Sequence, residues 1–237
     1  MNIKAIIFDK DGTLLDFDRF WVTVAENAAA YICESLNAPK TLIGKMLASV
    51  GVKDGVSDIG GALCSGTYEM ISELFASVLS EAGARFDRAE FYGLTLRAFH
   101  DCSASGEIVP TCEGLSELLS YLKRRGLILA LVTTDDAHIT GECLRALGID
   151  GCFAHIYCDD GVHPTKPDPY YLNRLLEAEG LTADEVMMVG DTLTDLSFAA
   201  RGGAIGVGVA KTASARALLE PRAYRVIEDV SHLPELL

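Results

Sequence analysis

The stretch IIFDKDGTLLD, residues 6–16, joins a short apolar run to a group of acidic residues. Such a run is typical of a strand buried on both faces of a parallel sheet. Because side chains alternate along a strand, Asp9 and Asp11 are expected to leave its carboxyl end pointing the same way. Two neighbouring carboxylates are unfavourable there unless a cation binds them. The stretch therefore predicts a Mg²⁺ site with a phosphate as a further ligand, although Asp-x-Asp-Gly is also an ordinary surface turn.

Composition bounds the class of protein. The chain has 237 residues, 49% of them hydrophobic, which fits one large domain or a core with a smaller insert. A formal net charge of −14 argues against a nucleic-acid partner. No apolar run is long enough to cross a membrane and no signal peptide is visible, so a cytoplasmic protein without a membrane partner is expected. The seven cysteines form no Cys-x-x-Cys pair, which indicates reduced thiols.

The segment after the first strand has helical periodicity. Apolar residues recur at helical spacing near residues 18–36, 40–49, 67–82 and 87–101, with Asp18 as a suitable N-cap. No strand is evident among them, so residues 17–102 are predicted to form an all-helical insert. The glycine-rich residues 51–66 do not have dinucleotide-binding spacing. They are either a mobile connection that touches substrate or a plain flexible turn.

Helices and strands alternate from residue 111 onward. Strands are expected at 127–132, 154–158, 185–189 and 204–209, with a weaker one near 223–227. This alternation predicts an α/β protein with a doubly wound parallel sheet, made from residues 1–16 and 103–237.

Two threonines follow the strand at 127–132. Thr133 and Thr134 stand where backbone N–H groups enter a helix, an arrangement suited to holding a phosphate. Thr133 as a simple helix N-cap is the ordinary alternative.

A lysine and two aspartates follow later in the core. Lys166 lies between two prolines in HPTKPDP, where it can offset charge that develops on a phosphate, although a lone lysine is more often solvated. Asp191 follows the strand at 185–189 and Asp195 lies one helical turn beyond it. Acidic groups that converge from two strands favour Mg²⁺, while helix capping accounts for one of this pair.

Four stretches in this order, DKDGTLLD, VTTD, HPTKPDP and VGDTLTD, resemble the motifs of the haloacid dehalogenase-like hydrolase superfamily. The resemblance covers nearly the whole chain. It is to the subfamily with a helical cap after the first motif, which contains phosphoglycolate phosphatases and β-phosphoglucomutases. It implies a Rossmann-like catalytic core with residues 17–102 as the cap. Lys10 and the CEG at residues 112–114 depart from the commonest forms and are expected to lie away from the chemistry.

The resemblance also implies roles for the matched residues. Asp9 is the expected nucleophile, and Asp11 the general acid and base. The expected phosphate and substrate ligands are Thr133, Thr134 and Lys166. The expected Mg²⁺ ligands are Asp9, Asp191 and the main-chain carbonyl of Asp11, with Asp195 supporting them.

The function expected from these residues is Mg²⁺-dependent hydrolysis of a small phosphorylated metabolite, with phosphoglycolate as the leading candidate. A phosphomutase uses the same acids and remains an alternative, as does a signalling domain that merely carries a phosphoaspartate. Asp11 argues against the dehalogenases. A phosphonatase would need a cap lysine such as Lys53 or Lys45, and no motif supports either. Lys53, or Arg19 instead, is the predicted cap ligand for a second negative charge on the substrate. The oligomeric state is left open.

Overall fold

The structure is a computed structural model, and it describes residues 2–237. The chain divides into two compact units. The core unit comprises the residues up to Asp16 together with Ile108–Leu237, and the inserted unit is Phe17–Glu107. The sequence predicts the second boundary after residue 102. In the structure, residues 103–107 pack within the inserted unit, where Asn27 Nδ2 donates a hydrogen bond to Ser105 Oγ at 2.9 Å.

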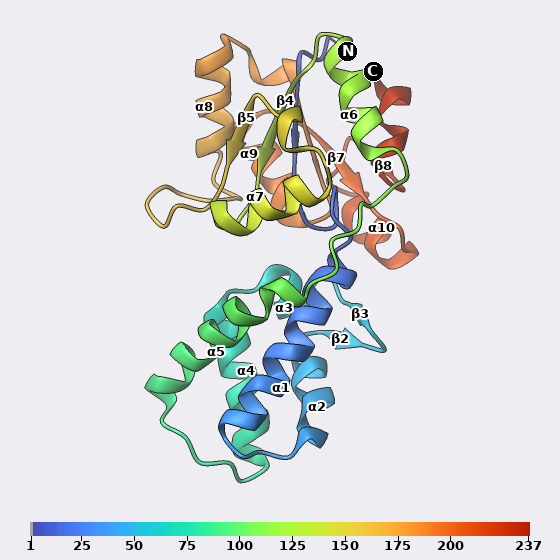
Figure 1. The fold of residues 1–237 in the computed structure, drawn as a ribbon. Coiled ribbons are helices and arrows are strands. Elements are labelled where there is room, and N and C mark those ends of the chain that lie inside the picture. Colours follow the sequence, from blue (N-terminus) through green and yellow to red (C-terminus); the bar gives the residue numbers. More distant parts are fainter. Residues whose placement is uncertain (1) are drawn as a thin grey trace. The chain divides into compact units, whose positions relative to one another are not determined.

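The core unit is built on a six-stranded sheet in which every neighbouring pair is parallel (Figure 1). In spatial order the strands are β5 (His155–Tyr157), β4 (Ile128–Val132), β1 (Ala5–Phe8), β6 (Val186–Gly190), β7 (Ile205–Val209) and β8 (Arg225–Ile227). The predicted doubly wound parallel sheet is therefore confirmed. The strand order reverses at β1, and parallel sheets bind ligands at the carboxyl ends of the strands beside such a reversal.

Five helices cover this sheet (Figure 1). They are α6 (Leu115–Arg124), α7 (Ala137–Ala146), α8 (Tyr170–Glu179), α9 (Leu193–Gly202) and α10 (Ala213–Leu219). Alternate side chains of β1 point to opposite faces of the sheet. Phe8 packs in one apolar cluster with Leu119 of α6. Ile7 packs in another with Leu172 of α8 and Phe198 of α9. Each such side chain stabilises the fold by about 1.5–3 kcal/mol when fully buried. This burial on both faces explains why the core strands read as continuous apolar runs.

The inserted unit consists mainly of helices. They are α1 (Thr23–Ser35), α2 (Ile43–Ser49), α3 (Ala62–Ser65), α4 (Tyr68–Glu81) and α5 (Arg88–Cys102), with a π-helical turn at Asp18–Val22 and 3-10 turns at Lys40–Leu42 and Ser103–Ser105. The predicted apolar stripe of the first helix is buried, since Phe20, Val24, Ala28 and Ile32 are at most 2% exposed. No helix within residues 2–237 is both long and apolar enough to span a bilayer.

The prediction that the insert is all-helical is wrong in one place. Within the glycine-rich stretch, β2 (Val52–Lys53) and β3 (Val56–Ser57) pair as an antiparallel hairpin. Its two central residues, Asp54 and Gly55, have φ values of 52° and 78°, as a tight hairpin turn requires. Strands of two residues are too short to show alternation, so the Asp-Gly pair was the available signal.

The prediction that Asp18 caps the first helix is also wrong. Its carboxylate accepts hydrogen bonds from Ser57 N at 3.0 Å and Ser57 Oγ at 2.5 Å. Asp18 therefore holds the hairpin against the start of the helix, within the inserted unit.

Candidate active site

The loop after β1 brings Asp9 to the carboxyl end of the sheet. Asp9 N donates to Val189 O at 2.9 Å, which continues the pairing of β1 with β6. The chain then turns at Gly12, whose φ is +75°. A Cβ at this position would lie 2.1 Å from Asp191 Oδ2. Gly12 is therefore needed both for the backbone conformation and for the approach of the β6 loop.

The loop after β6 supplies Asp191 and Asp195. Thr192 is the N-cap of α9, and Asp195, three residues later, closes a capping box: its Oδ2 accepts from Thr192 N at 3.0 Å and from Thr192 Oγ1 at 2.6 Å. A Cβ at Gly190 would lie 2.3 Å from Asp195 Cγ, so only glycine fits beneath this carboxylate. Asp195 therefore acts both as a helix cap and, through its second oxygen, as a partner of Lys166.

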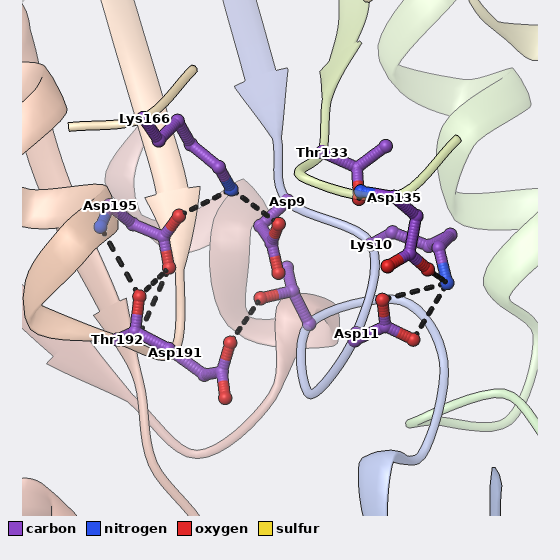
Figure 2. Close-up of polar contacts among 10 residues, drawn as sticks. Asp9, Lys10, Asp11, Thr133, Asp135, Lys166, Asp191, Thr192 and Asp195 are labelled. Carbon is purple, nitrogen blue, oxygen red and sulfur yellow. Dashed lines mark hydrogen bonds and ion pairs between the residues drawn. The ribbon is translucent and has the colours of Figure 1, made fainter. Parts of the chain in front are cut away.

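Lys166 links the two loops. Its Nζ donates to Asp9 Oδ1 at 2.5 Å and to Asp195 Oδ1 at 2.7 Å, as Figure 2 shows. Burial lowers the pKa of Lys166, but the carboxylates of Asp195 and Asp9 outweigh it and the net shift is upward. The lysine is therefore a fixed positive charge in a buried position.

Lys166 alone does not neutralise Asp9, Asp191 and Asp195, because the pKa values of Asp9 and Asp191 are raised. Burial raises the pKa of Asp9; Lys166 opposes this shift, Asp195 and Asp11 add to it, and the result is about 7. Burial and then the charges of Asp9 and Asp195 raise the pKa of Asp191 well above its usual range. Asp9, Asp191 and Asp195 each bring a carboxylate oxygen within 4.8 Å of the others. Crowded, buried oxygen donors of this kind suit a hard divalent cation.

The end of β4 contributes Thr133. It is 2% exposed, its N–H donates to Tyr157 O, and its Oγ1 accepts from Asp135 N at 3.2 Å. The N-cap of α7 is Asp136, which accepts from the N–H groups of His138 and Ile139. Those amides, expected from the sequence to face a phosphate, therefore already have a partner. Thr134 is exposed.

Lys53, the predicted substrate ligand of the insert, lies on β2 of the inserted unit and is exposed. Its alternative, Arg19, forms an exposed ion pair with Glu107 at 2.9 Å in the same unit. Neither residue belongs to the cluster of core-unit residues described above.

Lys10, expected from the sequence to lie away from the chemistry, contacts Asp11, the expected general acid and base. Lys10 is fully buried, and its Nζ lies 2.7 Å from each carboxylate oxygen of Asp11 and 2.9 Å from Asp135 Oδ2 (Figure 2). Asp9 and Asp11 therefore do not share one partner: Lys166 holds the first and Lys10 the second. Alternation fails here because the strand ends at Phe8 and the chain is already turning at Lys10.

The chain is similar in sequence to known hydrolases. The family model described as haloacid dehalogenase-like hydrolase matches residues 3–203. A phosphoglycolate phosphatase of Vibrio cholerae is 31% identical over 208 residues, 88% of this chain and 84% of the relative. An N-acetylmuramic acid 6-phosphate phosphatase of Pseudomonas putida is 29% identical over 196 residues, 83% of this chain and 78% of the relative.

The fold is also similar to a solved structure, that of a predicted phosphoglycolate phosphatase from Haemophilus somnus 129pt. The TM-score is 0.74 at 19% identity, with 100% of this chain and 98% of the other covered. The chain therefore belongs to the haloacid dehalogenase-like hydrolase family and is similar to its phosphatases along most of its length.

Proposed function

We propose that the protein is a phosphomonoesterase that hydrolyses a small phosphorylated metabolite through an aspartyl-phosphate on Asp9. The observation that carries this proposal is the buried Asp9 carboxylate at the end of β1, held by Lys166 beside Asp191 and Asp195. One oxygen of Asp9 is bound to the lysine. Its other oxygen is the candidate nucleophile.

The first step transfers the phosphoryl group to the protein. An Asp9 carboxylate oxygen attacks phosphorus, the bond from phosphorus to the ester oxygen breaks, and Asp11 gives its proton to the departing oxygen. Lys166 offsets the charge on the transferring group, and Thr133 is the proposed hydrogen-bond donor to it. Positioning and charge stabilisation supply most of the rate in this kind of reaction.

The second step releases phosphate. Water attacks phosphorus and passes a proton to Asp11, and the bond between phosphorus and Asp9 breaks. Asp9 is then a carboxylate again, Asp11 carries a proton, and inorganic phosphate leaves. The two steps together consume one ester and one water.

The proposed cofactor is Mg²⁺. Asp9, Asp191 and the main-chain carbonyl of Asp11 would hold it, while Asp195 would support the site through Lys166 and Thr192. When bound, the ion supplies positive charge to the phosphoryl oxygens. Asp191 is oriented by Thr13, whose buried Oγ1 lies 3.4 Å from Asp191 Oδ1.

A phosphomonoester that also carries a carboxylate is the proposed substrate, with phosphoglycolate as the first candidate. Both phosphatases named above act on such compounds, since glycolate and N-acetylmuramic acid each bear a carboxyl group. The net charge of −14 agrees with a small substrate, because it would repel a nucleic acid.

The function is tested by release of inorganic phosphate from a panel of phosphorylated metabolites, with p-nitrophenyl phosphate as a general probe. Repeated turnover with free phosphate as the product supports the proposal. Isomerised sugar phosphate without free phosphate would identify a mutase instead. A single phosphorylation without turnover would identify a signalling domain.

Asp11→Asn is expected to lower kcat by roughly 10²-fold or more, the usual scale for general acid–base catalysis. The loss should be greater for alkyl phosphates than for p-nitrophenyl phosphate, because p-nitrophenolate is a stable anion and leaves without a proton. Steady-state kinetics with both substrates measure the difference. Equal losses for both would remove Asp11 from the role of general acid.

Lys53→Ala is expected to raise KM for phosphoglycolate by roughly tenfold, the scale of one charge-assisted hydrogen bond. Hydrolysis of p-nitrophenyl phosphate, which has no carboxylate, should be almost unchanged. Lys45 is a second lysine of the inserted unit, and Lys45→Ala is the matched control. It should leave the kinetics with both substrates unchanged. An unchanged KM for phosphoglycolate in Lys53→Ala would exclude Lys53 from the substrate site.

A further inference from the structure

Lys10 is an uncommon kind of residue for its place in the fold. It directly follows Asp9 at the end of the central strand, and none of its surface is exposed. Its ammonium contacts both oxygens of Asp11 and one oxygen of Asp135. Burying a charge is unfavourable unless partners compensate it, and these two carboxylates are the compensation.

Overall stability does not explain this arrangement. A buried ion pair is often no more stabilising than well-packed apolar residues of similar volume. A buried pair does restrict the geometry of the groups it joins. Lys10 therefore restricts the side chains that it contacts, those of Asp11 and Asp135.

The backbone around Asp11 is already well fixed. Leu14 N and Leu15 N both donate to Lys10 O at 2.9 Å, and Gly12 N donates to Leu15 O at 2.7 Å. These bonds close the loop but leave the Asp11 side chain free to rotate about its own single bonds. Lys10 Nζ contacts both oxygens of the Asp11 carboxylate and so orients it, and Asp135 interacts with the same carboxylate.

Lys10 is in turn anchored from the neighbouring strand. Asp135 follows β4, and its position is fixed through the main chain: its N–H donates to Thr133 Oγ1 and its carbonyl accepts from Asp159 N at 2.9 Å. The series Asp135, Lys10, Asp11 thus connects the end of β4 to the proposed general acid (Figure 2). Each carboxylate oxygen has two lone pairs, so an Asp11 oxygen that contacts Lys10 can still face a substrate.

We propose that Lys10 is a positioning residue that, anchored by Asp135, holds the Asp11 carboxyl group in the orientation needed to protonate the leaving oxygen. The inference rests on the proposed function, in which Asp11 is the general acid. It predicts that Lys10 matters most for esters whose leaving group needs a proton.

Lys10→Met tests this directly, because methionine is similar in length and uncharged. Phenyl phosphate and p-nitrophenyl phosphate are suitable probes: they are similar in size, but phenolate, with a parent pKa of about 10, is much the poorer leaving group. We expect kcat/KM to fall roughly 10²-fold for phenyl phosphate and less than about tenfold for p-nitrophenyl phosphate. KM should change little. A Lys10→Met enzyme with the wild-type ratio between the two substrates would overturn the inference.

Lys10→Met also leaves Asp11 facing Asp135 without a cation, which can lower stability. The double variant Lys10→Met/Asp135→Asn removes the second carboxylate and should recover thermal stability while the ratio between the two esters stays reduced. Recovery of the wild-type ratio in the double variant would mean that Lys10 only balances the charge of Asp135, and the inference would be overturned. Lys123→Met is the matched control: this exposed lysine on α6 donates to Gly151 O, and its loss should not change the ratio.

Asp11→Asn, measured with the same two esters, separates this inference from the proposed function. A reduced ratio in Asp11→Asn with a wild-type ratio in Lys10→Met would overturn the role of Lys10 alone. A wild-type ratio in Asp11→Asn would overturn the proposed general acid, and the role of Lys10 with it. A reduced ratio in both variants supports the inference.

Discussion

Asp9→Asn is expected to abolish turnover of every phosphomonoester while leaving the fold intact. An amide cannot form the aspartyl-phosphate, so kcat should fall by roughly 10⁴-fold or more, as it does when a nucleophile is removed. The variant should be at least as thermally stable as the metal-free wild type at neutral pH. The pKa of Asp9 is raised to about 7, chiefly by burial, so its negative charge is unfavourable in the folded protein. Phosphate release and thermal unfolding in chelator measure the two effects.

The combination of lost activity and retained stability is what distinguishes a nucleophile from a structural residue. Asp184→Asn is the matched control, since Asp184 is exposed on the surface of the same unit, and it should have wild-type kinetics. Near-native phosphatase activity in Asp9→Asn, from protein free of wild-type enzyme, would falsify the assigned nucleophile.

The sequence predicts the sheet and most of the cluster for one reason. Asp9, Thr133 and Asp191 each come directly after, or one residue after, a continuous apolar run, and such runs become the central strands β1, β4 and β6. Carboxyl ends of neighbouring parallel strands lie at the same edge, so residues far apart in the chain must meet there. No knowledge of side-chain conformation is needed for this step.

The partners of these residues could not be predicted in the same way. Alternation places Lys10 opposite its two aspartates, but it applies only within a strand, and β1 ends at Phe8. The contact between Lys10 and Asp135 depends on how two loops pack, which no local pattern records. The contact of Asp195 with Lys166 could not be predicted either. Helix capping alone accounts for an aspartate at this position in the sequence.

Removal of the proposed metal ion is also expected to lower activity strongly. Without the ion, the three aspartates have Lys166 as the cationic partner seen in the described part of the chain, so the cluster lacks the positive charge needed to accept a phosphate dianion. Chelator should therefore lower kcat/KM by roughly 10³-fold or more, since a bound ion contributes several kcal/mol to stabilising charge in the transition state. Mg²⁺ should restore activity. Ca²⁺ should restore little, because its larger and less regular coordination displaces the attacking carboxylate. Full activity of the metal-free protein in excess chelator would contradict the proposal that a metal ion is required.

Thermal stability gives a readout of the same site that is independent of activity. The pKa values of Asp9 and Asp191 are raised, so the metal-free folded protein binds more protons than the unfolded chain. The extra bound protons stabilise the folded protein at acidic pH. This stabilisation is lost as pH rises from 3.8, the ordinary pKa of aspartate, through about 7, the pKa of Asp9. A bound cation favours the carboxylates, so Mg²⁺ should raise Tm more at about pH 8 than at about pH 5. Ca²⁺ should also raise Tm, although it restores little activity. Asp191→Asn removes one proposed ligand and should reduce both responses, whereas Asp184→Asn should not. An equal Mg²⁺ response in Asp191→Asn would show that the ion binds elsewhere.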